Sequence, residues 1–401
     1  MINEWWLWEE EIQPGQVWKE RLTVAWDTAH ENTVYGYGGL EDHFDAQVEI
    51  DIPKPSSEFV QFSSSVKSGT SETKTFAVPP GIDVLYIRVE PGYFESGGKQ
   101  LWIKADLFNP SKCKLGYHEI LVTSECAAHK CTTTMLVRKP VPGTWTIKLT
   151  GKTSRFKQKR YTGKPVPFSV IIGEGSIPIT NLRLKEVTLL VVSNPGTIYF
   201  PEEIEAIREF VFQGGSLLVI EIPSMRGYTP STRCLTQLFG VDVVGDELHG
   251  QFRTFEPRNI GQKWPLEGII ECKPMTQHYI TKGLQKVVAF RPGAFRIIDK
   301  QPFVYQDMNG KRHIIESSFL AQGVLMAGHN VRIPEVPTLS PIILLCAVEF
   351  GKGRVVVSGS PDFVNYATGR LHILSTVLDY DCYDNKVLSE RILDWLLKRE
   401  H

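Results

Sequence analysis

The sequence predicts a multidomain β plus α/β protein, in which an N-terminal antiparallel β-sandwich precedes a C-terminal α/β domain. Short alternating apolar and polar runs, separated by proline and glycine turns, fill the chain up to about residue 172. Continuous apolar runs with an amphipathic helix between them begin at about residue 187. The length of 401 residues allows two or three domains, and the hydrophobic fraction of 42% is ordinary for a folded protein.

The N-terminal half contains segments typical of half-buried strands, and none of them has a helical period. Turns such as Pro79-Pro80-Gly81 and Pro142-Gly143 separate the segments. We therefore expect residues 1–172 to form a jelly-roll-like sandwich. The expected strands are 20–26, 46–51, 84–89, 101–107, 134–138, 144–149 and 167–172.

The C-terminal half alternates strands with helices. Residues 187–193 and 216–222 are apolar runs typical of strands covered on both faces. Between them, 201–212 has an apolar helical face, with Pro201 in the first turn and Gly214 after the end. Strand, helix and strand in this order predict a parallel sheet. Residues 173–186 are the expected linker, and the other expected elements are a helix at 230–239, a hairpin at 344–358 and a closing helix at 385–398.

One passage of the N-terminal half resembles a known family of sandwiches. Asp106-Leu107-Phe108-Asn109-Pro110 is followed by Pro142-Gly143-Thr144-Trp145-Thr146-Ile147. These segments are similar to the D-L-x-x-P turn and the P-G-T-W-T-I strand of pre-peptidase C-terminal domains. The resemblance implies an accessory binding module rather than an enzyme.

Four motifs in order along residues 187–401 resemble the class I glutamine-amidotransferase fold, especially its non-catalytic intraflagellar-transport (GIFT) type. The resemblance implies a flavodoxin-like three-layer α/β sandwich. The motifs are Asn194-Pro195-Gly196, Gly214-Gly215-Ser216, His278-Tyr279-Ile280-Thr281-Lys282-Gly283, and residues 353–362 with the sequence GRVVVSGSPD.

The residues that glutamine hydrolysis requires are missing from these motifs. An active enzyme needs a thiolate at a strand-to-helix elbow and an imidazole base after the last strand. At the elbow the sequence has Ile222, Pro223 and Ser224, and Ser360-Pro361-Asp362 stands where the family has H-P-E. We therefore expect no glutaminase activity, and we interpret Cys234 as a core residue of the second helix.

The predicted function is that of a non-catalytic scaffold that binds a protein or a small ligand. Because ligands bind at the carboxyl ends of strands in open α/β sheets, the expected binding residues are Asn194, Ser224, Ser360 and Asp362. No catalytic residue is expected. The alternative is a serine hydrolase that uses Ser224, with Ser360, Asp362 and His278 as helpers, although Ser224 could simply cap a helix.

A zinc site is the alternative for a cluster of possible ligands in the N-terminal half, since thiolates and imidazoles are the ligands that zinc prefers. Free thiols or a local bridge between Cys126 and Cys131 explain the same residues, so no metal is expected. The cluster is Cys113, His118, Cys126, His129 and Cys131. No cofactor is expected either, because the chain has no P-loop, no Rossmann glycine fingerprint and no H-E-x-x-H motif.

Charge and hydropathy limit the partners. A net charge of −1 gives no overall attraction to nucleic acid, and no apolar run approaches the roughly 20 residues of a membrane span. The identity of a protein partner or ligand stays open, as does a role as a homo-oligomer or assembly subunit. The acidic, aromatic N-terminus is unlike a signal peptide. We expect a cytoplasmic protein if Met1 is the native start, and an extracellular one if a signal peptide has been removed.

Overall fold

The computed structural model consists of two compact units. The α/β unit comprises Met1–Asp51, Ile179–Tyr305 and His313–His401, and the sandwich unit comprises Ile52–Pro178 with Gln306–Arg312. The residues that the structure describes are 22–27, 29, 46–92, 101–122, 133–153, 165–193, 199–221, 230–244, 256–257, 269–290, 292–298, 303–306, 312–315, 321–328, 331–332, 341–360, 363–364 and 384–398.

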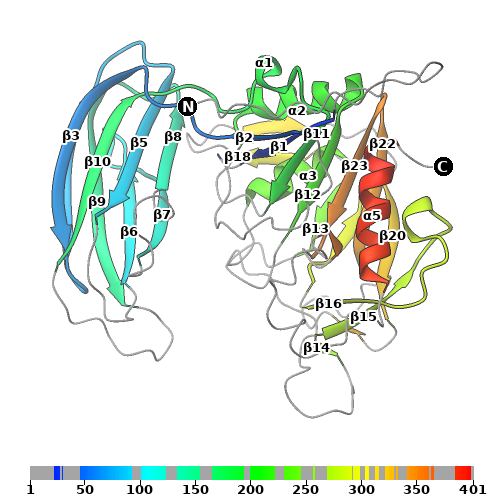
Figure 1. Ribbon diagram of the computed structural model, residues 1–401. Helices are drawn as coiled ribbons and strands as arrows, with labels where there is room; N and C mark the ends of the chain where they lie inside the picture. Colours follow the sequence, from blue (N-terminus) through cyan, green and yellow to red (C-terminus); the bar gives the residue numbers. More distant parts are fainter. Residues whose placement is uncertain are drawn as a thin grey trace. The chain divides into compact units, whose positions relative to one another are not determined.

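The sandwich unit has two four-stranded antiparallel sheets that face each other (Figure 1). One sheet has the order β3-β10-β5-β8 and the other the order β4-β9-β6-β7. Consecutive strands β3 and β4 therefore lie in different sheets. The strands are β3 (Ser57–Val66), β4 (Ser71–Val78), β5 (Val84–Pro91), β6 (Leu101–Phe108), β7 (Lys114–Val122), β8 (Thr133–Arg138), β9 (Gly143–Thr153) and β10 (Val166–Glu174).

Apolar side chains from both sheets form the core of the sandwich. Trp145 and Phe168 are among its largest fully buried side chains, and they come from β9 and β10. The indole Nε1 of Trp145 donates a hydrogen bond of 2.8 Å to the carbonyl oxygen of Val141. This bond satisfies the one polar atom of the ring, so the indole can be buried without an unpaired donor.

The α/β unit is built on a mixed sheet with five adjacent parallel strands. Their order is β23-β12-β11-β1-β2, and every neighbouring pair is parallel. On the side of β23 the sheet continues through antiparallel strands in the order β22-β20-β15-β16. The strands are β1 (Thr23–Asp27), β2 (Ala46–Ile50), β11 (Leu189–Ser193), β12 (Ser216–Ile220), β15 (Ile269–Pro274), β16 (Val287–Phe290), β20 (Gln322–Ala327), β22 (Ile343–Phe350) and β23 (Gly353–Ser358).

Smaller strand pairs complete the described part of the fold. β13 (Val241–Val243) pairs with β17 (Phe295–Ile297), which also pairs with β22. Two further pairs join β14 (Glu256–Pro257) to β21 (Val331–Arg332), and β18 (Phe303–Gln306) to β19 (Arg312–Ile315).

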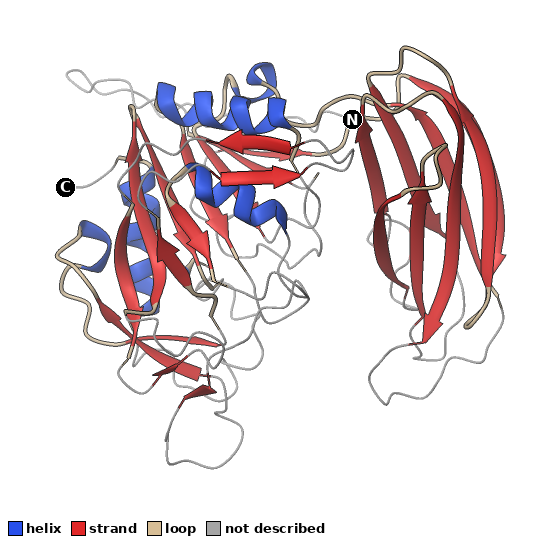
Figure 2. Cartoon of the chain, turned by 180° about the vertical axis from the view of Figure 1, so that it is seen from behind, coloured by secondary structure: helices blue, strands red, loops and turns tan. Residues whose placement is uncertain are grey.

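Helices cover both faces of the large sheet (Figure 2). On one face, α1 (Asn181–Leu184), α2 (Pro201–Gln213) and α3 (Pro230–Leu238) pack against alternate residues of β11 and β12. On the other face, α5 (Asn385–Leu396) packs against the remaining residues of the same strands. The core is therefore divided by the sheet into two apolar layers. None of the described helices is both long and apolar enough to cross a membrane.

The expected elements of the C-terminal half are confirmed. Helices α2, α3 and α5 lie where the sequence predicts them, and β22 and β23 form the expected hairpin. Gly214 caps α2 with φ of 124°, a left-handed value that favours glycine. The parallel pairing of β11 with β12 around α2 confirms the predicted strand-helix-strand unit.

The first two strands correct the expected boundary of the sandwich. We expected 20–26 and 46–51 in the sandwich, but β1 and β2 pair in parallel with each other, and β1 pairs with β11 of the large sheet. Val24, Ala25 and Trp26 are all buried, as in a strand covered on both faces. The partner strand begins at Leu189, so no local pattern could reveal the pairing. The sandwich is therefore inserted between β2 and β11.

The chain leaves and re-enters the α/β unit through hydrogen-bonded residues. Arg183 Nη1 donates to the carbonyl oxygen of Asp51 at 2.9 Å, and Ile179 N donates to Glu203 Oε1 at 3.0 Å. Within the sandwich, Ser56 N donates to Glu174 O at 2.8 Å, so the two ends of this unit lie side by side. The expected linker at 173–186 is thus structured at both ends, by β10 and by α1.

Candidate functional site

Four parallel strands of the α/β unit end in buried polar residues. Asp27 and Ser193 are the last residues of β1 and β11, Glu221 follows β12 directly, and Ser358 ends β23. Because these strands are adjacent and parallel, their carboxyl ends meet at one edge of the sheet. Ligands of open α/β sheets bind at this edge, and polar groups are rarely buried without a reason. We call these four residues, together with Ser360, the carboxyl-edge cluster.

Asp27 is held by a buried tyrosine. Tyr199 OH donates a hydrogen bond of 2.5 Å to Asp27 Oδ2, and both residues are buried. Burial raises the pKa of Tyr199 well above its usual value, and the negative charge of Asp27 raises it further. The phenol therefore keeps its proton and acts as a donor to the carboxylate.

Glu203 organises the backbone beside Asp27. Its Oε2 accepts from Phe200 N at 2.9 Å, which caps the start of α2, while its Oε1 accepts from Ile179 N. Burial lowers the pKa of the Arg183 guanidinium, and the negative charges of Asp51, Asp27 and Glu203 oppose that shift. Three acids and one arginine thus lie close together at the end of β1.

The turn after β23 is packed tightly against other backbone. Gly359 N donates to Leu344 O at 2.9 Å, and a Cβ at Gly359 would lie 2.4 Å from Gly293 O, so only glycine fits. Ser358 Oγ donates to Ser360 O at 2.7 Å. Ser360 is fully buried. The position that the amidotransferase resemblance assigns to the histidine base therefore carries a serine enclosed by the turn.

His278 supports local structure on the α5 side of the sheet. Its Nδ1 accepts from Ile280 N at 3.2 Å and caps the short helix η2 (Tyr279–Thr281). The imidazole lies edge-on to Trp395 of α5, with 5.2 Å between ring centroids. These contacts fix the ring by packing and capping.

The described thiols of the α/β unit lie in its interior. Cys234, Cys272 and Cys346 are buried, whereas Cys113 of the sandwich is exposed and free. Burial raises the pKa of Cys234 to about 12 and also raises the pKa of Cys346. Because the thiolate is the nucleophile, neither cysteine has the form that catalysis requires near neutral pH. The interpretation of Cys234 as a core residue of α3 is confirmed.

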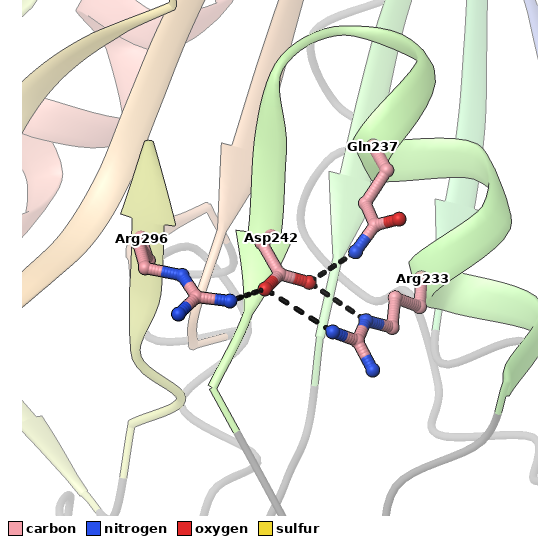
Figure 3. A network of polar contacts seen from close by, with 4 residues as sticks. All are labelled: Arg233, Gln237, Asp242 and Arg296. Carbon is pink, nitrogen blue, oxygen red and sulfur yellow. Dashed lines mark hydrogen bonds and ion pairs between the residues drawn. The ribbon is translucent and has the colours of Figure 1, made fainter. Parts of the chain in front are cut away.

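A second polar cluster joins α3 to two strands (Figure 3). Asp242 of β13 accepts from Arg233 Nε at 2.7 Å, and it also contacts Gln237 Nε2 and Arg296 Nη2. The carboxylate is buried, while the Arg296 side chain is 57% exposed. Arg233 also reaches the second carboxylate oxygen at 3.3 Å, so the pair is bidentate. This arrangement holds α3, β13 and β17 together.

Several candidate residues lie outside the described part of the chain. They are Asn194, Ser224, Asp362, Cys126, His129 and Cys131. Of the remaining zinc candidates, His118 lies on β7 opposite Ala105, and Cys113 comes just before that strand. In the part of the chain that the structure describes, no group of three or more metal-ligating side chains is found.

The sequence motifs predict Ser360 at the carboxyl edge but do not reveal Asp27, Tyr199, Glu203 and Glu221. A signal was present for two of them. Asp27 is the last residue of the strand TVAWD and Glu221 directly follows the strand SLLVI, so each acid stands at the carboxyl end of a buried strand. Tyr199 and Glu203 had no such signal, because their role depends on where α2 packs.

Comparisons with known proteins show structural likeness over about half of the chain. No family model and no curated protein matches the sequence. The mmIFT52 N-terminal domain is 15% identical, with a TM-score of 0.36, and the match covers 54% of this chain and 80% of that one. A cytoplasmic protein from Salmonella typhimurium is 16% identical, with a TM-score of 0.34 and coverage of 55% and 76%. A ThuA-like protein from Bacteroides uniformis is 12% identical, with a TM-score of 0.30 and coverage of 54% and 72%.

Proposed function

We propose that this protein is a non-catalytic scaffold that binds a protein or a small ligand at the carboxyl edge of its α/β sheet. One observation carries the proposal. Ser360, which stands where the amidotransferase pattern has its histidine base, is a fully buried serine held in a glycine-dependent turn. A serine hydroxyl cannot accept a proton near neutral pH as an imidazole does. This supports an edge that holds polar groups rather than one that transfers protons.

The finer description of the fold belongs to the same proposal. We infer a flavodoxin-like, amidotransferase-like α/β domain, supported by five parallel strands with helices on both faces. We infer a jelly roll for the sandwich, supported by its eight antiparallel strands in two four-stranded sheets. The motifs at 106–110 and 142–147 support its assignment as a pre-peptidase C-terminal-like module.

The proposed binding residues combine the carboxyl-edge cluster with the loops that follow the same strands. Asn194 comes after Ser193, Ser224 comes shortly after Glu221, and Asp362 comes after Ser360. Asp27 and Glu221 add two buried carboxyl groups to this edge. The proposed binding residue Asp362 favours a ligand or peptide that offers hydrogen-bond donors, because a carboxylate only accepts hydrogen bonds.

The contacts of His278 support the non-catalytic alternative over a serine hydrolase. Its Nδ1 already accepts a backbone hydrogen bond, and its ring packs on Trp395. Because Nδ1 accepts this hydrogen bond, the neutral ring carries its proton on Nε2, so neither ring nitrogen is available in this arrangement to take a proton from a nucleophile. We propose that Ser224 acts as a binding or capping residue.

Turnover assays on the whole chain test this proposal. The wild type and the Ser224→Ala and Ser360→Ala variants would be incubated with L-glutamine and with p-nitrophenyl acetate. We expect no ammonia release and no ester hydrolysis above the buffer rate from any of the three proteins. Ester hydrolysis that the Ser224→Ala substitution abolishes would establish the hydrolase instead. Glutamine hydrolysis by the wild type would overturn the assignment of the elbow.

A further inference from the structure

Strand β3 forms one edge of the sandwich. It spans ten residues, Ser57–Val66, and pairs with β10 on one side (Figure 1). Among the described strands, none pairs with its other side. A register shift between Ile172 and Gly173 interrupts the pairing near the start of β3 and leaves 60–66 in regular register. This regular stretch presents an edge of backbone groups that another strand could use.

Charged residues guard the middle of the neighbouring edge strand β4, whereas the only charged residue within β3 is Glu58, near its start. Lys74 of β4 stands opposite the buried Ile147, but its side chain is 47% exposed, and its Nζ pairs with Glu72 Oε1 at 3.2 Å. Inward-pointing charges and lysines are devices that stop edge strands from pairing with other chains. Residues 60–66, with the sequence VQFSSSV, contain no charge and no proline. The edge strands β3 and β4 of one sandwich thus differ in charge.

The sequence of this stretch suits pairing with itself. If two copies meet antiparallel with Ser63 at the two-fold axis, Gln61 stands opposite Ser65 and Phe62 opposite Ser64. No like charges face each other in this register, and such charges would be unfavourable. Gln61, Ser63 and Ser65 are exposed on the outer face of the strand, so nothing described covers them.

We propose that β3 is a homodimerisation edge, on which residues 60–66 pair antiparallel with the same residues of a second copy of this chain. The occupant is a second copy because two copies of this uncharged stretch can pair in the two-fold register without facing like charges. Strand addition of this kind draws its affinity from main-chain hydrogen bonds. The two sheets would then join into one continuous eight-stranded sheet across the dimer.

Sedimentation equilibrium of the full chain tests the proposal directly. We expect a wild-type dimer whose dissociation constant rises roughly tenfold or more in Ser63→Lys, because two lysines then stand opposite each other. Thr73→Lys is the matched control, since Thr73 is an exposed residue of the guarded strand β4. We expect this variant to dimerise like the wild type. A wild type that stays monomeric at high concentration, or a dimer that Ser63→Lys leaves unchanged, would overturn the proposal.

Cysteine crosslinking tests the register without relying on a charged substitution. In a Cys113→Ser background, Ser63→Cys should form an intermolecular disulfide under mild oxidation, because the two thiols meet at the axis. Ser65→Cys should not, since each new thiol would face Gln61. The background without an added cysteine reports crosslinks from other thiols. Equal crosslinking of Ser63→Cys and Ser65→Cys would rule out the proposed register, and crosslinking of neither would count against dimerisation through β3.

Discussion

The two units of this protein differ in what they bury. Among the described buried polar residues, Asp106 is in the sandwich, and the others are in the α/β unit, including Asp27, Glu203 and Glu221. The sandwich is also almost one continuous segment, whereas the α/β unit is assembled from three. The almost entirely apolar core of the sandwich is explained by its contribution to stability alone. Buried carboxylates are costly, so their concentration in one unit, several at one sheet edge, supports the proposal that this unit holds the binding site.

The comparison predicts that the two units can be separated, and this is the largest effect we expect. Replacing Ile52–Pro178 with a short glycine-serine linker should remove the sandwich and leave a folded α/β unit, because the two ends of the insert lie side by side. Circular dichroism should keep a helical signal, and unfolding should stay cooperative. An insoluble or unfolded product would show that the α/β sheet depends on the insert.

A cavity in the sandwich core should affect that unit alone. Trp145 is fully buried, so Trp145→Ala should lower the free energy of unfolding of the sandwich by about 3–5 kcal/mol. Trp145→Phe should cost less, because it keeps most of the ring volume while losing the bond to Val141. Denaturant titration that follows each unit separately would measure both. An equal loss in the α/β unit would show that the units unfold together.

Loss of the Glu203 carboxylate should have the complementary effect on the α/β unit. Glu203→Ala leaves the backbone N–H groups of Phe200 and Ile179 without their acceptor. We expect a loss of about 2–4 kcal/mol, since each unsatisfied buried donor is costly. Glu202→Ala on the exposed side of the same helix turn is the matched control, with an expected change within about 0.5 kcal/mol. Similar losses in the two variants would contradict the role given to Glu203.

The smallest expected effect is a pH dependence of the sandwich. Burial opposes ionisation of Asp106, but hydrogen bonds from Lys114 and Lys104 outweigh it, so the pKa of this carboxyl is lowered. A lowered pKa means that the stabilisation is present above the unfolded value of about 3.9 and is lost as the pH falls through the folded value. The unfolding temperature of the wild type should therefore fall more steeply with decreasing pH than that of Asp106→Asn. Parallel curves of unfolding temperature against pH for the two proteins would show that ionisation of Asp106 does not contribute to stability.

Elements whose signals lie within a few residues could be predicted from the sequence, whereas a pairing between distant segments could not. The α2 helix, the β22–β23 hairpin and α5 were identified because their periodicity and caps lie within a few residues. The sequence did not show that β1 and β2 belong to the α/β sheet, because β1 pairs with β11, whose residues come after the whole sandwich in the chain. Alternation in ERLTVAW indicated a strand, but a strand pattern does not name its partner.

The candidate site was predictable to the extent that its residues follow strands. The motif after β23 predicts Ser360 as a binding residue, and the structure places this buried serine just beyond the end of that strand, so its role in binding stays a prediction. Tyr199 and Glu203 could not be identified, since their polar atoms are brought to Asp27 and Ile179 by the packing of α2. Ser224, Asn194 and Asp362 stay predictions, because they lie outside the described residues.

The position of the insert also sets the order in which the chain can fold during synthesis. β1 and β2 leave the ribosome before the sandwich, but β11, the partner of β1, is translated only after it. At roughly 5–20 residues per second, this delay lasts on the order of ten seconds. During that time the apolar residues Val24, Ala25 and Trp26 have no sheet to join. The sandwich can complete its own fold during this time. The nascent chain then carries a folded sandwich next to two strand segments that cannot yet join their sheet. We expect a chaperone to protect these two segments.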